Sequence, residues 1–200
     1  MTDFLIATNN THKVEEFKRI LLPLGVNVLS AKEAGIELGD VVEDGKTFAE
    51  NAKIKALSAF RKAGIPSIAD DSGLCVDALM GAPGIYSARY GGEDIPQSER
   101  NALLLSEMLK SGKDTRTARF VSSICCVFSE EDIIALEGIC EGTIAQAPCG
   151  DGGFGYDPLF IYEDGRCFGA IDGDEKDKVS HRGRALRALR DELIKRKDVL

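Results

Sequence analysis

The sequence predicts an α/β protein with a mixed β-sheet and flanking helices. Two observations support this fold class. Strand-like and helical segments alternate in the first half of the chain, and strand-like runs separated by turns fill residues 117–168. Alternation followed by a run of strands is typical of a mixed sheet surrounded by helices. The 200 residues suit one large domain or two tightly joined lobes.

The chain opens with a strand, a polar turn, a helix and a second strand. Residues 4–7 and 26–29 are short apolar runs that favour strands. Between them, residues 14–22 place apolar side chains on one helical face, and Pro23 ends that helix. The polar turn therefore connects the first strand to the first helix.

A longer helix is expected to begin at Thr47. Thr47 and Glu50 have the spacing of a capping box, and Gly64 follows the last apolar position as a C-cap. The extended run 65–69 then leads into residues 70–73, which read Asp-Asp-Ser-Gly. These polar residues are expected to follow a buried strand.

The second half is expected to hold a helix, several strands and a last helix. Residues 98–109 have amphipathic helical spacing, and strands fill 117–168 with turns at 129–132 and 163–165. Ser180 is expected to cap the last helix.

Charge and composition disfavour several classes of protein. The net charge is −8, and no basic stripe for binding nucleic acid is visible. No apolar run is long enough to cross a membrane, and the N-terminus lacks the pattern of a secretory signal. We therefore expect a cytoplasmic protein that binds neither nucleic acid nor membrane. The six cysteines show no CxxC pair or zinc-finger spacing, so we expect reduced, mostly apolar side chains.

Two segments resemble nucleotide-binding loops but do not fit them. Residues 150–155 match GxGxxG, but 156–161 read as a strand where that fingerprint needs a helix. Residues 39–47 resemble a P-loop, but the glycine spacing is one residue too long and three acids would repel phosphate. The acidic loop 37–45 suits a metal ligand better.

Asp70 and Asp71 are the first candidates for chemistry. Adjacent carboxylates at the end of a buried strand are costly, because they repel one another and lose water. A divalent cation such as Mg²⁺ would relieve that cost. The alternative is a structural Asx-type turn, in which Asp-Asp-Ser-Gly is also comfortable. From this segment alone, both interpretations stay open.

Three further polar segments are equally ambiguous by themselves. Residues 8–13, which end with Lys13, could bind phosphate or could simply cap a helix. Residues 154–157 place an aromatic ring beside a glycine, which could stack on a base or only form a turn. His181 and Arg182 begin the last helix, where cations oppose the helix dipole. That position suggests an anionic or carbonyl ligand, or a carboxylate partner elsewhere in the chain.

Six motifs together resemble the inosine triphosphate pyrophosphatase family, also called the non-canonical purine NTP pyrophosphatases. They follow one another from residue 7 to residue 183, so the resemblance covers nearly the whole chain. In order, the motifs read ATNN with Lys13, TFAENA, ADDSGL, GAPGIYSARY, GFGYDP and SHRG.

The resemblance implies one domain over residues 1–200, an elongated mixed sheet, two lobes around a central cleft, and a homodimer. It implies hydrolysis of ITP, dITP and XTP to the monophosphate and pyrophosphate, with one or more Mg²⁺ ions as cofactor. This hydrolysis would remove the non-canonical nucleotides from the nucleotide pool. Asp71 would be the proton acceptor and, with Glu43, a metal ligand. The substrate-binding residues would be Thr8, Asn9, Asn10, Thr11, His12, Lys13, Ser72, Phe154, Gly155, Tyr156, Asp157, Lys176, His181 and Arg182.

Within that set, Lys13 and Lys176 would stabilise charge on the phosphates, and His181 or Arg182 would donate to the 6-keto oxygen of the base. Other acids of the loop 37–45 and Lys178 remain alternatives to Glu43 and Lys176. Two other functions also remain open. One is a related pyrophosphatase with another base specificity, and the other is a nucleotide-binding regulator without catalysis.

Overall fold

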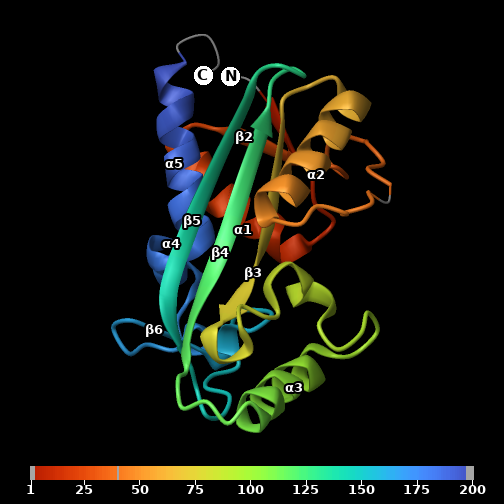
Figure 1. Cartoon of the computed structure of the whole chain (residues 1–200). Coiled ribbons are helices and arrows are strands. Elements are labelled where there is room, and N and C mark those ends of the chain that lie inside the picture. The colour runs from red at the N-terminus through yellow and green to blue at the C-terminus, as the bar shows by residue number, and fades with distance from the viewer. Residues whose placement is uncertain (1–2, 40, 197–200) are drawn as a thin grey trace. The chain divides into compact units, whose positions relative to one another are not determined.

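The computed structural model describes residues 3–39 and 41–196 and has a mixed α/β fold (Figure 1). The strands are β1 (Asp3–Ile6), β2 (Asn27–Ser30), β3 (Ser67–Val76), β4 (Thr117–Val127), β5 (Ile133–Ile144) and β6 (Phe160–Tyr162). The α-helices are α1 (Thr11–Leu21), α2 (Phe48–Ala63), α3 (Gln97–Lys110), α4 (Gly173–Val179) and α5 (His181–Lys195).

The strands form a sheet in the order β2-β1-β3-β4-β5-β6. β1 pairs in parallel with β2 and β3, whereas β5 and β6 pair antiparallel, so the sheet is mixed. The predicted fold class is therefore confirmed. None of the helices in the described part of the chain is long and apolar enough to span a membrane.

The chain divides into two compact units. Unit 1 comprises Met1–Asp71, Ser122–Gly138 and His181–Leu200, and unit 2 comprises Ser72–Val121 and Ile139–Ser180. The strands β3, β4 and β5 each contribute residues to both units. The two lobes and the central cleft that the resemblance implies stay predictions.

In unit 1, the strands carry a separate hydrophobic core on each face. One core contains apolar residues of α1 and α5, and the other contains the alanines of α2. Ile68 of β3 belongs to the first core, and its neighbour Ala69 belongs to the second. Because side chains alternate along a strand, the next two residues, Asp70 and Asp71, point to opposite faces.

Local sequence sets the ends of α2 as predicted. The hydroxyl of Thr47 accepts a hydrogen bond from the backbone N–H of Glu50 at 3.2 Å. The Glu50 carboxylate accepts from the backbone N–H of Lys46 at 2.5 Å, one residue before the partner in a standard capping box. Gly64 ends the helix with a φ of 66°, in the left-handed region that glycine tolerates.

The structure corrects the expected end of the strand before Asp70. β3 runs on through residues 70–73 to Val76, so both acids lie within the strand and not in a turn after it. The Asx-type turn is therefore excluded at this position.

In the second half, one further expectation was wrong and one helix was missed. Residues 156–161 do not form one strand, because a 3-10 turn with Pro158 in its first turn precedes the short β6. The short helix α4 was not predicted, since its sequence is mostly polar. It begins where the side chain of Asp172 accepts from the backbone N–H of Glu175 at 2.8 Å.

The expectation that all six cysteines are reduced was also wrong. Cys149 and Cys167 form a disulfide across 18 residues of sequence. The backbone brings them together, since Cys149 N–H donates to the carbonyl of Pro158 at 2.8 Å and Gly150 packs directly on Gly169. Spacing rules do not detect such a pair. Cys75, Cys125, Cys126 and Cys140 lie outside this disulfide.

Helix α5 rests directly on β5 at Gly138. A Cβ atom at this position would lie 2.1 Å from the carbonyl oxygen of His181 and 2.7 Å from the backbone nitrogen of Ala185. Such contacts are far inside van der Waals distance, so only glycine fits here. The first turn of α5 is thereby held against the strand.

Candidate functional site

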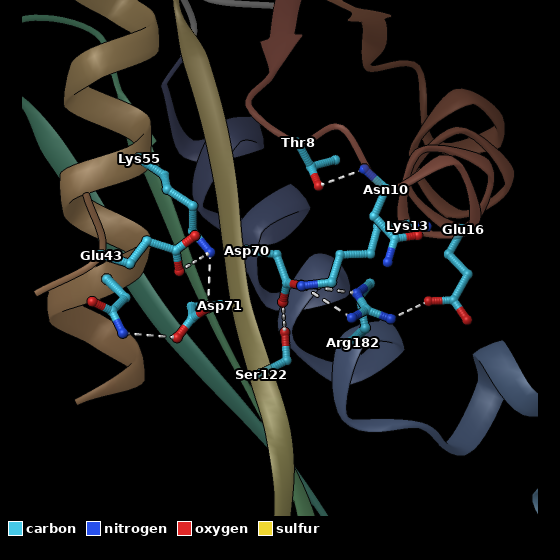
Figure 2. Close-up of polar contacts among 11 residues, drawn as sticks. Thr8, Asn10, Lys13, Glu16, Glu43, Lys55, Asp70, Asp71, Ser122 and Arg182 are labelled. Carbon is cyan, nitrogen blue, oxygen red and sulfur yellow. Dashed lines mark hydrogen bonds and ion pairs between the residues drawn. The ribbon is translucent and has the colours of Figure 1, made fainter. Parts of the chain in front are cut away.

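Asp70 and Asp71 are adjacent in β3, and their side chains lie on opposite sides of the strand (Figure 2). Asp70 faces α1 and α5, whereas Asp71 faces α2. The mutual repulsion that the sequence suggested is therefore reduced. Each carboxylate is neutralised instead by a lysine on its own face.

Asp70 lies at the centre of a buried ion cluster. Its Oδ2 is 2.7 Å from Nζ of Lys13 and 3.0 Å from Nη2 of Arg182. Its Oδ1 accepts a hydrogen bond from the hydroxyl of Ser122 at 2.5 Å. Arg182 also forms an ion pair with Glu16 of α1. Burial would raise the pKa of Asp70, but Arg182 and Lys13 outweigh it and hold that pKa well below its usual range.

The two cations of this cluster respond differently to burial. Burial lowers the pKa of Lys13, even though Asp70 opposes that shift. For Arg182, the carboxylates of Asp70 and Glu16 outweigh burial and raise the pKa above its usual value. Arg182 is only 1% exposed. Its guanidinium therefore stays charged, and removal of a partner would leave a buried charge without compensation.

The second cluster surrounds Asp71. Nζ of Lys55, from α2, lies 2.8 Å from Oδ1 of Asp71 and 3.0 Å from Oε2 of Glu43. Asn51 links the acidic loop to the strand, because its side chain accepts from Gly45 N–H at 2.9 Å and donates to Asp71 at 3.4 Å. Burial raises the pKa of Asp71 against the opposing effect of Lys55.

The donors of this second cluster fit a magnesium ion that arrives with phosphate. Within residues 3–39 and 41–196, no group of three or more His, Cys, Asp or Glu side chains is placed to hold a metal. Mg²⁺ commonly uses one or two carboxylates and completes its shell with water and phosphate oxygens. Glu43 and Asp71 already share one cation, the ammonium of Lys55. These two carboxylates are therefore the residues that could hold the metal.

The loop from residue 8 to residue 13 caps α1, as one of its two interpretations predicted. The hydroxyl of Thr8 accepts from the backbone N–H of Asn10 at 3.2 Å, and the side chain of Asn10 accepts from Lys13 N–H at 3.2 Å. Lys13 turns inward to Asp70. The exposed residues of the loop are Asn9, Asn10, Thr11 and His12. Polar groups of the loop therefore remain exposed to solvent at the N-terminus of α1. Phosphate binding at this position stays a prediction.

In unit 2, the predicted residues gather around Lys176 of α4. Its Nζ lies 2.6 Å from Oδ2 of Asp157, and both side chains are buried. The same Asp157 oxygen accepts from the backbone N–H of Phe154 at 2.8 Å. Nζ of Lys176 also lies 4.6 Å from the centre of the Phe154 ring, a cation–π contact. In this structure, Lys176 therefore orders the aromatic segment, and its predicted contact with phosphate stays a prediction.

The other predicted residues of unit 2 have structural contacts. The hydroxyl of Tyr156 donates to the carbonyl of Ser87 at 3.0 Å. Gly155 has a φ of 61°, and its carbonyl accepts from the side chain of Asn101 at 3.3 Å. Ser72 lies half-buried in β3, as the first residue of unit 2.

The buried start of α5 confirms one of the alternatives for Arg182, while both alternatives for His181 stay predictions. The sequence suggested either a ligand or a carboxylate partner elsewhere, and Arg182 has two such partners, Asp70 and Glu16. His181 is 5% exposed. A contact of either residue with a base stays a prediction.

Sequence reasoning missed four side chains that complete the clusters of unit 1: Glu16, Asn51, Lys55 and Ser122. Three of them left a signal, because helical spacing puts Glu16 near Lys13 and puts Asn51 and Lys55 on one face of α2. Ser122 left none, since it reads as an ordinary residue of a buried strand.

Comparisons with known proteins agree with the six sequence motifs between residues 7 and 183. The model of the Ham1 family matches residues 4–192. A dITP/XTP pyrophosphatase of Clostridium perfringens is 47% identical to this chain, with 96% of this chain and 98% of the relative covered. A dITP/XTP pyrophosphatase of Thermus thermophilus is 46% identical, with 92% and 88% covered.

Solved structures give the same result for the fold. A HAM1 protein from Coxiella burnetii superposes with a TM-score of 0.89 at 36% identity, covering 98% of this chain and 100% of that one. The Ham1 protein of Staphylococcus aureus has a TM-score of 0.84 at 35% identity, with the same coverage. The matched motifs, the family model and these relatives together establish that the chain belongs to the Ham1 family.

Proposed function

We propose that this protein hydrolyses non-canonical purine nucleoside triphosphates, such as dITP, XTP and ITP, to the monophosphate and pyrophosphate. The observation that carries the proposal is the cluster of Asp71, Glu43 and Lys55, which combines a carboxylate of raised pKa with a second carboxylate and a cation. The relatives are named dITP/XTP pyrophosphatases, which supports the same substrate class.

The proposed reaction is attack of water on the α-phosphorus. The water oxygen forms a bond to phosphorus, the bond from phosphorus to the α,β-bridging oxygen breaks, and pyrophosphate leaves. Asp71 accepts the proton of the water. Its raised pKa suits this role, because a base is most effective when its pKa lies near the working pH. The reaction run in ¹⁸O-water should place the label in the monophosphate, and label in pyrophosphate would contradict this direction of attack.

Cations of unit 1 bind the triphosphate in this proposal. Lys13 lies beside the polar loop that begins α1, and Lys55 lies between the two carboxylates. Both ammonium groups can donate to phosphate oxygens and stabilise negative charge there. A Mg²⁺ ion held by Glu43 and Asp71 would neutralise further charge on the phosphate oxygens.

The base is assigned to aromatic and cationic side chains. Phe154 would stack on the purine, since the contacts with Asp157 and Lys176 hold its segment in place. Arg182 or His181 would donate to the 6-keto oxygen of hypoxanthine or xanthine. Adenine carries an amino group there, and a polar mismatch of this kind can discriminate by ~10⁴.

We further propose a cytoplasmic homodimer. Unit 2 exposes large apolar side chains, with Met80 90% and Leu109 84% exposed. Such side chains mark a protein interface where they form one contiguous patch. Light scattering of the purified protein should give twice the mass of the chain, and loss of the dimer on Met80→Asp would locate the contact.

One experiment tests the proposed function against its rivals. Pyrophosphate release is measured over a panel of nucleotides, with and without EDTA. We expect turnover of dITP, XTP and ITP far above ATP and GTP, and loss of that turnover in EDTA. Preference for modified pyrimidines would indicate a related pyrophosphatase with another specificity. Binding without turnover would indicate a nucleotide-binding regulator.

A further inference from the structure

We propose that Asp70 and Ser122 are positioning residues that hold Lys13 and Arg182 on one carboxylate. The Asp70 carboxylate thereby orients both Lys13, which is assigned to the phosphates, and Arg182, which is assigned to the base. This inference rests on the proposed function and assigns a role to two residues outside its machinery.

The geometry of the Asp70 carboxylate separates its two oxygens. Oδ2 contacts both cations, at 2.7 Å for Lys13 and 3.0 Å for Arg182. Oδ1 accepts from Ser122 at 2.5 Å (Figure 2). Lys13 belongs to α1, Arg182 to α5 and Ser122 to β4. A single side chain of β3 therefore ties together three other elements of unit 1.

The hydroxyl of Ser122 fixes the plane of this carboxylate. The last torsion of an aspartate side chain is broad, so packing alone orients its carboxylate weakly. A hydrogen bond on Oδ1 restricts that rotation and keeps Oδ2 aimed at the cations. Ser122 is 0% exposed, and a hydrogen bond to a charged group is stronger than one between neutral groups. Loss of the hydroxyl would let the carboxylate rotate away from one or both cations.

A purely structural role explains this cluster less well. Apolar residues of similar volume often replace buried ion pairs without loss of stability. Here the ion cluster holds the two cations that the site uses, and the Lys13 side chain keeps 16% of its surface exposed. Glu16 contacts Arg182 through a different nitrogen from those that contact Asp70. The guanidinium is thus oriented by two carboxylates, and one of them, Asp70, also contacts Lys13.

The test compares Ser122→Ala with Ser123→Ala. Replacement of Asp70 could unfold the protein, so the hydroxyl is removed instead. Ser123 is the matched control, because it is the next residue of β4, is 1% exposed, and donates to a different carboxylate, Glu137, at 3.1 Å. Melting temperature, the competitive Ki of inorganic triphosphate, and kcat/KM for ITP and ATP are measured for wild type and both variants.

We expect both variants to melt at similarly lowered temperatures. Only Ser122→Ala should raise the Ki of inorganic triphosphate and also lower the ITP/ATP preference. Each change should be about tenfold, which corresponds to about 1.4 kcal/mol and is of the size expected for a hydrogen bond to a charged group. A joint shift in both readouts is the signature of one carboxylate serving both cations.

The remaining outcomes each overturn a distinct claim. If wild type releases no pyrophosphate from any purine triphosphate, the proposed function fails. If wild type is active and Ser122→Ala moves neither readout, or Ser123→Ala moves both equally, the positioning role fails. If only one readout moves, Asp70 serves one cation and the shared role is wrong.

Discussion

Asp70 and Asp71 are consecutive residues of β3, yet they pair with lysines of different helices, Lys13 of α1 and Lys55 of α2. The alternation of the strand separates them into two environments. Asp70 has a pKa well below its usual range, whereas the pKa of Asp71 is raised. Two acids whose environments move their pKa values apart can have two roles. Asp70 suits a permanent counter-ion, and Asp71 suits a proton acceptor.

Replacement of Asp71 by asparagine should abolish turnover and leave the fold intact. The amide keeps the shape of the side chain but cannot accept the proton, and general base catalysis is worth roughly 10²–10⁴ in rate. Pyrophosphate release and a thermal melt measure the two effects. Glu130→Gln is a suitable control, because its partner Arg61 is mostly exposed and the pair lies at the surface. Near-normal turnover in Asp71→Asn would remove this residue from the mechanism.

We expect kcat/KM to rise from acidic to mildly alkaline pH. At higher pH it should decline again, and the decline should begin before pH 10.5 is reached. The acidic limb follows Asp71, which must lose its proton and does so at a raised pKa. The alkaline limb follows Lys13, whose pKa is lowered from 10.5 by burial, so its positive charge is lost earlier than in an exposed lysine. The measurement is kcat/KM for ITP against pH.

Lys13→Arg provides the control for that profile. Arginine keeps its charge throughout this range, so its alkaline limb should move to higher pH even if the overall rate is lower. An unmoved limb would assign it to another group. A maximum below neutrality would instead indicate a different base or a required general acid.

Arg182→Ala should collapse the preference for ITP over ATP and also destabilise the protein. Arginine donates hydrogen bonds and never accepts them, so it can favour a 6-keto oxygen and not a 6-amino group. Its removal also breaks the buried ion pairs with Glu16 and Asp70, although Lys13 still contacts Asp70, and breaking a buried pair costs roughly 3–5 kcal/mol. Arg182→Lys keeps the charge and provides a more stable variant for kinetics.

The measurement is kcat/KM for both nucleotides, expressed as a ratio of ratios, beside a thermal melt. Arg61→Ala serves as the control for loss of an exposed arginine. If ITP and ATP are affected equally in Arg182→Ala, base reading by this residue is wrong. Arg182 would then orient the cluster only.

Cys149→Ser should lower the melting temperature of the oxidised protein. A disulfide that closes a loop of about this length contributes about 3 kcal/mol, which corresponds to roughly 6–12 °C for a chain of this size. Cys75→Ser is the control, because Cys75 is a partly buried cysteine of the same unit that lies outside this disulfide. Alkylation without reductant followed by mass spectrometry checks the bond directly. Labelling of both Cys149 and Cys167 would contradict the disulfide.

The sequence was sufficient for the fold class because local patterns carried it. The cap at Thr47, the stop at Gly64 and the polar loop before α1 depend on residues close in the chain. The end of β3 was misjudged, because polar residues normally mark a turn. Here ion pairs across α1, α2 and α5 stabilise two acids within a strand, and those pairs are not local.

The candidate site could be predicted only as a set of separate motifs. Motifs identified Lys13, Asp71 and Arg182, but did not indicate that Lys13 and Arg182 meet on Asp70. That contact joins residues 112 positions apart, and one sequence carries no record of such distances. Ser122 and the Cys149–Cys167 pair were missed for the same reason.

Gly138 has no functional group, yet it determines how accurately Arg182 is aimed. The backbone of α5 contacts the strand there without an intervening side chain. Changes of side-chain rotamer therefore cannot shift or rotate the helix at this contact. The strand acts as a rigid mount for the first turn of α5. A single added methyl group would displace the first turn of α5. Because the arginine side chain is long, the displacement would be larger at its guanidinium. Activity can therefore be lost through a glycine that has no chemical role of its own, in a protein whose chemical groups are all still present.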